Sequence, residues 1–299
     1  MFWQIISIIL LCLVLLMLLA ALATARYVMT GKRQTYEEAF AWQQAHYDVS
    51  WFDRSLLKEY KVRGSEGYEL TTYFYPAPRE TDRYIILSHG YTDNILGNLK
   101  YMKMYLDQGF NLVLYDLRGH GKNEKAPTTY GVRESVDLLH LIDDTRRRYP
   151  DLKVLGLHGE SLGAATSVTC LKYKPLVDFV VADCPFADIK NVLRAGVKNS
   201  PLAPVLIFLG SLGSMLLYGI SFNAMQPVLA VEDNDVPILF VHGLADDFIV
   251  PENSFRIAKA TKGRSSVCTI EGAAHAVSAI VNPEKYREAL NEFLSSLGL

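Results

Sequence analysis

The fold is decided by residues 154–171, which read VLGLHGESLGAATSVTCL. The apolar run at the start of this stretch predicts a buried strand, and the small and apolar residues at its end predict a helix. Between them stands the pentapeptide Gly159-Glu160-Ser161-Leu162-Gly163. A Gly-x-Ser-x-Gly sequence between a strand and a helix is typical of a tight turn that holds a serine hydroxyl above a sheet. The stretch therefore predicts that Ser161 is a nucleophile.

Beyond about residue 60, the chain repeats this order of strand, loop and helix. Its short runs are apolar on both alternating faces, which is typical of a mostly parallel sheet with helices on both sides, an α/β fold. Residues 68–75 alternate more and predict an antiparallel edge hairpin with residues 60–63. The six clearest strands are Tyr84–Leu87, Leu112–Tyr115, Val154–Leu157, Phe179–Ala182, Pro237–Val241 and Val267–Ile270.

A serine hydroxyl needs a histidine base, and the base needs a carboxylate to hold its tautomer. Of the seven histidines, His275 is the predicted base, because it follows the last strand in a loop of small residues where a histidine has little to pack against. His140 lies on a predicted helix and His46 lies in the segment before the main domain. Neither is placed for this role.

The predicted acid follows the strand Pro237–Val241. The chain leaves this strand through His242-Gly243-Leu244-Ala245-Asp246-Asp247, so a carboxylate emerges just past a strand end, where folds of this class place catalytic loops. Asp246 is preferred because it lies four residues after His242, the usual offset in the pattern His-Gly-x-x-Asp, and Asp247 is the alternative. Whichever aspartate is not catalytic is interpreted as a turn or cap residue.

The negative charge of a tetrahedral intermediate needs preorganised N–H donors. One predicted donor is the backbone N–H of Leu162, directly after the nucleophile at a helix start. The other is expected after the first central strand, in Ser88-His89-Gly90-Tyr91, and Tyr91 is the predicted residue. The phenol of Tyr91 either contacts substrate or lines the wall of the pocket.

Composition excludes other classes of function. The chain has 30 Lys and Arg against 32 Asp and Glu, and this balance gives no electrostatic reason to expect nucleic acid as a partner. The four cysteines are far apart and form no C-x-x-C pair or zinc-like spacing. They are interpreted as free, mostly buried thiols, and neither a metal nor a cofactor is expected.

Residues 1–25 contain no charged side chain, and their length predicts a transmembrane anchor. A cleaved signal peptide is the alternative, because Ala23-Thr24-Ala25 has the small-x-small form, although no basic region precedes the apolar run. Arg26, Lys32 and Arg33 follow the span, so the positive-inside tendency favours a single-pass protein of the cell membrane with a cytoplasmic catalytic domain.

The segment of residues 26–59 is expected to be a helical connector, and residues 60–299 the catalytic domain. Within the connector, Thr35-Tyr36-Glu37-Glu38 has the spacing of a capping box. It opens an aromatic-rich stretch, residues 40–52, that predicts a helix close to the membrane or to the main domain.

Several motifs together resemble those of an α/β hydrolase: His89-Gly90, Tyr115-Asp116-Leu117-Arg118-Gly119-His120-Gly121, Gly159 to Gly163, His242-Gly-x-x-Asp246 and His275. The resemblance covers about residues 60–299. It is nearest to bacterial membrane-anchored serine hydrolases of unassigned substrate, related to the prolyl-oligopeptidase-like and cinnamoyl-esterase-like branches. In that family the Arg-Gly-His-Gly loop is structural, so the resemblance gives His120 no catalytic role.

Residues 199–231 contain no charged side chain, and two interpretations are open. A second membrane span would place the strands before and after it on opposite sides of one membrane. A buried or membrane-facing cap, about residues 187–231, avoids this problem, and the resemblance implies a cap between the sixth strand and the acid-bearing strand. Such a cap beside an anchor leads to the hypothesis that the pocket opens toward the bilayer and takes lipid-like esters.

The predicted function is therefore a serine hydrolase that cleaves small or lipid-like apolar esters through an acyl-enzyme intermediate. Two alternatives remain: a peptidase or amidase of the same fold, and a membrane-anchored protein that binds a lipid or partner without catalysis. Fold alone does not separate them. The ordered set of Ser161, Asp246 and His275 favours an enzyme, because a binding module needs no such set.

Overall fold

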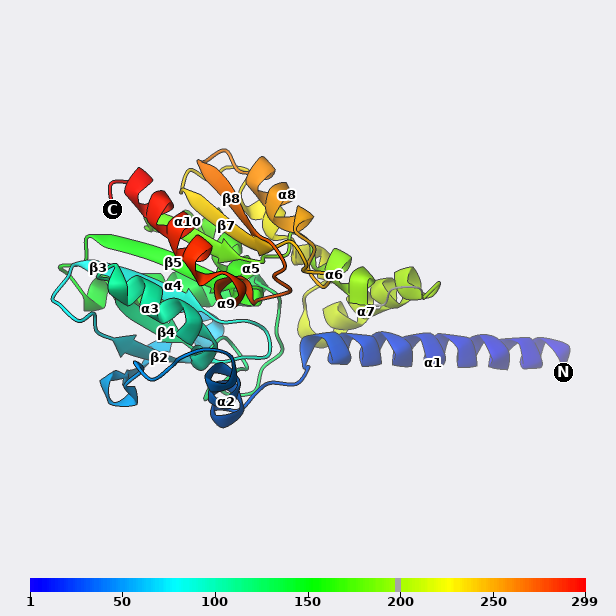
Figure 1. Ribbon diagram of the computed structural model, residues 1–299. Coiled ribbons are helices and arrows are strands. Elements are labelled where there is room, and N and C mark those ends of the chain that lie inside the picture. The colour runs from blue at the N-terminus through cyan, green and yellow to red at the C-terminus, as the bar shows by residue number, and fades with distance from the viewer. Residues whose placement is uncertain (197–199) are drawn as a thin grey trace.

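The computed structural model describes residues 1–196 and 200–299. Its centre is a sheet with the strand order β1-β2-β4-β3-β5-β6-β7-β8 (Figure 1). The strands are β1 (Lys58–Arg63), β2 (Glu69–Tyr75), β3 (Arg83–Ser88), β4 (Asn111–Tyr115), β5 (Val154–Glu160), β6 (Phe179–Asp183), β7 (Ile238–Gly243) and β8 (Ser265–Ile270). β2 pairs antiparallel with β1 and β4, and all other neighbours are parallel. The predicted sheet and edge hairpin are confirmed.

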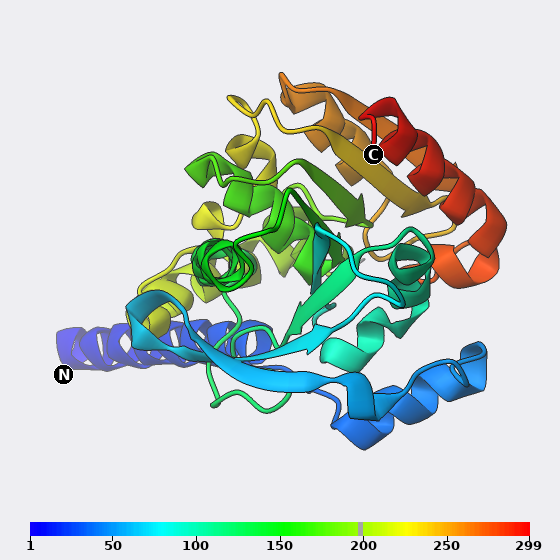
Figure 2. The same ribbon diagram turned by 90° about the vertical axis from the view of Figure 1, so that its left-hand side faces the viewer.

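Helices cover both faces of this sheet (Figure 2). They include α3 (Leu99–Asp107), α4 (Val132–Arg148), α5 (Leu162–Cys170), α8 (Glu252–Ala260), α9 (Ser278–Val281) and α10 (Pro283–Ser296). Consecutive strand residues enter opposite cores: Ile86 lies in the core with α4 and α5, whereas Ile85 lies in the core with α3 and α10. Both side chains are fully buried. This two-sided burial explains why the strands are continuous apolar runs in the sequence.

The register of the parallel strands brings distant parts of the chain to one edge of the sheet. Ser88 at the end of β3 pairs with Gly159, Glu160 at the end of β5 pairs with Asp183, and Gly243 at the end of β7 pairs with Ile270. The loops that follow these strands therefore start side by side, which is where ligands bind in open α/β sheets.

The N-terminal helix α1 (Phe2–Met29) continues past Ala25 and projects from the sheet domain (Figure 1). Its most apolar window has a mean hydropathy of 3.3, and the helix is long enough to cross a membrane. A signal sequence would have the same properties. Its buried residues, Ala21, Ala25, Val28 and Met29, all lie in its C-terminal third.

The connector contains α2 (Tyr36–His46) and the short 3-10 helix η1 (Arg54–Leu56). Thr35 caps α2 through the predicted capping box: its Oγ1 accepts from the N–H of Glu38, whose carboxylate accepts from the N–H of Thr35. The helix ends at His46, so the prediction of helix over residues 40–52 is wrong in extent. Tyr47 is extended, with φ −160°, and Phe52 stacks instead on Tyr75 of β2.

Between β6 and β7 lie α6 (Ile189–Gly196), α7 (Ala203–Tyr218), η5 (Phe222–Ala224) and η6 (Pro227–Ala230). Because β6 and β7 are neighbours in one sheet, the segment between them leaves and returns to the same domain. α7 has 16 residues, about 24 Å of helix, which is shorter than the roughly 30 Å core of a bilayer. The remaining 3-10 helices are η2 (Ser65–Gly67), η3 (Ile95–Asn98) and η4 (Leu171–Tyr173).

Candidate active site

Ser161 stands in a sharp turn between β5 and α5. Its backbone has φ 51° and ψ −110°, a conformation that costs free energy for any residue with a side chain. The turn needs glycine on both sides: a Cβ on Gly159 would collide with the carbonyl of Gly163, and a Cβ on Gly163 would collide with the carbonyl of Ser88. The Ser161 N–H donates to the carbonyl of Asp183 at 2.8 Å, which fixes the turn to β6.

His275 lies in the loop after β8, next to this serine. Its Nε2 is 3.0 Å from Ser161 Oγ, and its Nδ1 is 2.7 Å from Asp246 Oδ2. An ionised carboxylate only accepts hydrogen bonds, so Nδ1 carries the proton and Nε2 is left to accept from the serine hydroxyl. The imidazole is thus oriented as a general base toward Ser161.

Asp246 is buried beyond β7, and Asp247 is exposed. Burial raises the pKa of Asp246, but hydrogen bonds with His242 and His275 and with the N–H of Ile249 lower it more, so the net pKa lies below its ordinary value. Its Oδ1 accepts from the N–H groups of Phe248 and Ile249, at 3.1 and 2.8 Å. Asp246 is therefore held as a carboxylate in one orientation.

His242 holds the loop that carries Asp246 in place. Its Nε2 donates to the carbonyl of Ile249 at 2.6 Å, and its Nδ1 is 2.7 Å from the hydroxyl of Ser254. Both ring nitrogens are thus engaged within the fold, and the side chain is fully buried. The motif His242-Gly-x-x-Asp246 is one structural unit in which the histidine shapes the loop that presents the aspartate.

A cavity of about 660 Å³ opens at Ser161. Three helices supply most of its apolar wall: Thr24, Tyr27 and Val28 from α1, Ile189, Val192 and Leu193 from α6, and Leu206 and Ile207 from α7. Leu162 and Tyr91 also line it. Leu162 opens α5, so its N–H belongs to the first turn, which has no acceptor within the helix.

The phenol of Tyr91 lines the cavity and binds the protein itself. Its oxygen accepts from the N–H of Gly31 at 2.9 Å and donates to the carbonyl of Val28 at 3.1 Å. Tyr130 stacks on its ring, with centroids 5.6 Å apart, and donates to the same carbonyl. The phenol thus forms part of the cavity wall, and its contact with substrate stays a prediction.

A second polar cluster surrounds Glu160, the residue before Ser161. The sequence did not predict it. Lys100 forms a buried ion pair with Glu160 and donates to the carbonyl of Ala276 at 2.8 Å. The Tyr101 hydroxyl lies 2.7 Å from a Glu160 oxygen and 2.9 Å from an Asp183 oxygen, so both carboxylates share its single proton as acceptors. Lys100 thereby joins Glu160, the residue before Ser161, to Ala276, the residue after His275. The sequence offers one sign of this cluster: Glu160 and Asp183 are charged residues at the very ends of two apolar strands, β5 and β6.

The charges in this cluster are set by burial and by each other. Burial raises the pKa of Asp183 to about 6, and the nearby Glu160 adds to the rise. Burial lowers the pKa of Lys100, but Glu160 raises it more, so the ammonium form is favoured overall. Lys100 therefore remains the cation that keeps the carboxylates together.

Cys184, Asp246 and His275 place three potential metal ligands within 4.8 Å of one another. Their chemistry does not fit a metal centre. Burial raises the pKa of the Cys184 thiol well above its ordinary value, whereas metals bind the thiolate. The carboxylate and imidazole are already engaged with each other, so the trio is explained by the hydrogen bond alone.

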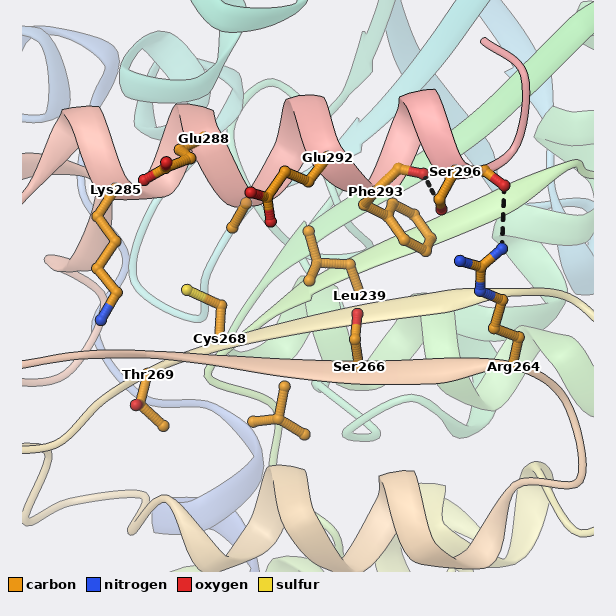
Figure 3. A pocket seen from close by; sticks show the side chains of 12 residues that line it. Leu239, Arg264, Ser266, Cys268, Thr269, Lys285, Glu288, Glu292, Phe293 and Ser296 are labelled. Atoms are coloured by element: carbon orange, nitrogen blue, oxygen red, sulfur yellow. Dashed lines mark hydrogen bonds between the residues drawn. The ribbon is translucent and has the colours of Figure 1, made fainter.

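A separate hollow of about 630 Å³ lies between β8 and α10 (Figure 3). Its walls carry polar and charged side chains such as Lys285, Glu288 and Glu292, and Arg264 donates to the carbonyl of Ser296 at 3.0 Å. None of its lining residues belongs to the site around Ser161, so the hollow has no part in the chemistry described above.

The sheet, the turn at Ser161 and its neighbours define an α/β hydrolase. A family model described as serine aminopeptidase, S33, matches residues 79–236, more than half of the chain. The chain belongs to this family.

Two kinds of similarity accompany this match. The uncharacterized protein YqkD of Bacillus subtilis is 32% identical over 257 residues, which cover 82% of each chain. In fold, the chain is similar to the esterase Pf2001 of Pyrococcus furiosus, with a TM-score of 0.68 and 21% identity over 84% of this chain and 97% of that one. It is also similar to the acylaminoacyl peptidase of Pyrococcus horikoshii, with a TM-score of 0.62 and 15% identity over 81% and 41% of the two chains.

Proposed function

We propose that this protein is a serine hydrolase that cleaves carboxylic esters with apolar acyl groups. One observation carries the proposal: His275 is within hydrogen-bond distance of both Ser161 Oγ and Asp246, and Ser161 lines an apolar cavity. In the first step His275 takes the proton from Ser161 as its oxygen attacks the ester carbonyl carbon. The N–H groups of Leu162 and Tyr91 are the proposed donors to the oxyanion.

The second half of the reaction uses the same groups. The protonated His275 gives its proton to the departing alcohol, which leaves an acyl group on Ser161. A water molecule then loses a proton to His275 and attacks the acyl carbon, which releases the acid and restores the serine. The low pKa of Asp246 keeps a negative charge beside the imidazolium that forms in each step.

The lining of the cavity favours an ester with an apolar acyl group as the substrate, rather than the N-terminus of a peptide. An aminopeptidase needs an anionic group to receive the substrate ammonium. Among the described residues that line the cavity, none is a carboxylate, and Lys32 supplies a positive charge. Amide hydrolysis remains the second candidate because the family is named for an aminopeptidase and the same serine chemistry serves both bonds.

Labelling with a fluorophosphonate probe tests the proposal, because the probe reacts with an activated serine. The full chain in detergent is expected to take up the probe and to hydrolyse aryl esters, and Ser161→Ala is expected to lose both. Ser50→Ala, which changes an exposed serine in the turn after α2, is the control. Folded wild-type protein without Ser161-dependent labelling would favour the non-catalytic binding protein. Faster cleavage of aminoacyl arylamides than of aryl esters would favour a peptidase.

A further inference from the structure

The C-terminal turn of α1 is built into the catalytic domain. The carbonyl of Val28 accepts from the phenols of Tyr91 and Tyr130, and the carbonyl of Met29 accepts from the N–H of Thr128 at 2.8 Å. Val28 and Thr24 also line the cavity at Ser161. The C-terminal end of α1 is therefore a wall of the proposed substrate site.

α7 lies beside α1 at close range (Figures 1 and 2). A Cβ on Gly210 would lie 2.6 Å from Thr24 Cγ2, and a Cβ on Gly213 would collide with the carbonyl of Ala21. Small residues are buried on both helices: Ala21 and Ala25 on α1, and Gly210, Gly213 and Ser214 on α7. This close approach through small residues is typical of helices that associate within a membrane.

The opposite face of α7 is apolar and uncovered. Five residues at helical spacing form an outer stripe: Val205 (53% exposed), Phe208 (63%), Leu212 (47%), Met215 (50%) and Leu216 (69%). Soluble proteins rarely expose an apolar patch of this kind without a binding partner. Leu and Ile side chains of α1, the helix on which α7 packs, are exposed as well.

The occupant of this stripe follows from its neighbour. α1 is long and apolar enough to cross a bilayer, and a helix held against its C-terminal part lies at the membrane surface or just inside it. α7 is too short to cross, and α6 before it and Phe222 after it both line the cavity. An apolar helix that enters and leaves on one side fits the interfacial region of one leaflet.

We propose that α7 inserts into the membrane beside α1 and that the two helices set the mouth of the cavity against the bilayer. The substrate class is then an ester of a long acyl chain that enters from the membrane, because α1, α6 and α7 supply most of the apolar wall of the cavity at Ser161. The insertion of α7 stands on its own, whereas the substrate class rests on the proposed function.

Spin labels measure the insertion directly, without catalysis. A background with Cys12→Ser and Cys268→Ser removes the two cysteines that are not buried. The full chain then carries a label at Phe208→Cys or, as control, at Leu176→Cys, an exposed leucine (71%) in the loop before β6. Vesicles contain equal amounts of phosphatidylcholine and phosphatidylglycerol.

The label at position 208 is expected to be accessible to oxygen and protected from a water-soluble nickel chelate, and the label at position 176 is expected to show the reverse. Access of the chelate to position 208 would overturn the insertion. Protection from both reagents, with dipolar broadening between labels, would show that a second copy covers the stripe and would overturn it as well.

Kinetics on vesicles test the substrate class. Phe208→Asp is expected to lower hydrolysis of a membrane-embedded long-chain ester by about tenfold or more, because a carboxylate resists entry into lipid. Hydrolysis of a short, water-soluble ester by the same vesicles is expected to be unchanged, as is all activity of Leu176→Asp. Equal losses on both esters would overturn the lipid path. If wild-type protein cleaves neither ester, the proposed function fails, while the spin labels still decide where α7 lies.

Discussion

The two sides of the cavity at Ser161 are built differently. Its polar side includes Ser161, which follows β5 and meets His275 and, through it, Asp246 in the loops after β8 and β7. Its apolar side comes from α1, α6 and α7, helices that lie far apart in the sequence. The polar side depends on single atoms at fixed distances, whereas the apolar side depends on the combined shape of many side chains. Changes to the polar side should therefore abolish activity, and changes to the apolar side should redirect it.

The largest effect is expected when the acid on the polar side is changed. Asp246→Asn cannot accept from Nδ1 as a carboxylate does and favours the wrong imidazole tautomer, so kcat is expected to fall by about 10⁴. Asp247→Asn is the matched control, since Asp247 is exposed, and should stay near the wild-type rate. Steady-state hydrolysis of an aryl ester measures both. A larger loss for Asp247→Asn would move the acid to the neighbouring position.

A smaller effect is expected from a change in the polar cluster around Glu160. Lys100→Met removes the cation that links Glu160 to the carbonyl of Ala276, and kcat is expected to fall by about 100-fold because Ser161 and His275 lose their relative position. KM should change little, and Lys100→Arg should restore part of the rate.

A purely structural role for Lys100 would give a different result. Thermal unfolding would shift, while the kcat of the remaining folded protein would equal that of the wild type. Lys103→Met, on an exposed position of α3, controls for the loss of a positive charge.

On the apolar side, Leu193→Trp is expected to fill part of the cavity. The ratio of kcat/KM for long-chain over short-chain esters should fall by about tenfold, the usual cost of misfit in an apolar pocket. Arg194→Trp adds the same side chain at an exposed position of α6 and should leave the ratio unchanged. If Leu193→Trp lowers kcat/KM equally for long-chain and short-chain esters, this wall does not contact the acyl group.

The smallest expected effect concerns stability. Burial lowers the pKa of His158 to about 3, and Lys100 adds to this decrease. The folded state therefore binds fewer protons than the unfolded state, so stability is lost as pH falls from about 6.5 toward 3. Between pH 8 and pH 5 this loss is about 2 kcal/mol. His158→Gln should lack this pH-dependent loss of stability. The melting temperatures of the wild type and His158→Gln should therefore differ less at pH 5 than at pH 8. A difference in melting temperature that does not change with pH would contradict the lowered pKa of His158.

The comparison also separates what sequence can predict from what it cannot. The strands were predictable because each must bury both faces, as Ile85 and Ile86 do. The sequence predicts Ser161, Asp246 and His275 as site residues because each follows the end of a strand in a recognisable turn. The structure brings these three together, and their catalytic roles stay a proposal.

The apolar side carried no such signal. The sequence of residues 199–231 stands out only for its lack of charge. Nothing in the sequence of α1 indicates that Thr24 and Val28 line a cavity. The role of Lys100 was likewise hidden, because it depends on Glu160 and Ala276 meeting across the sheet edge. These features come from tertiary contacts between segments that no local pattern connects.

The turn at Ser161 has a consequence for how the activity can be lost. With φ 51° and ψ −110°, the position suits glycine better than serine, and a residue in such a conformation costs of order 1–3 kcal/mol. Ser161→Gly should therefore raise the melting temperature while it removes the hydroxyl. Folding stability therefore does not protect the proposed chemistry: a chain without the Ser161 hydroxyl is expected to fold better than the chain that carries it.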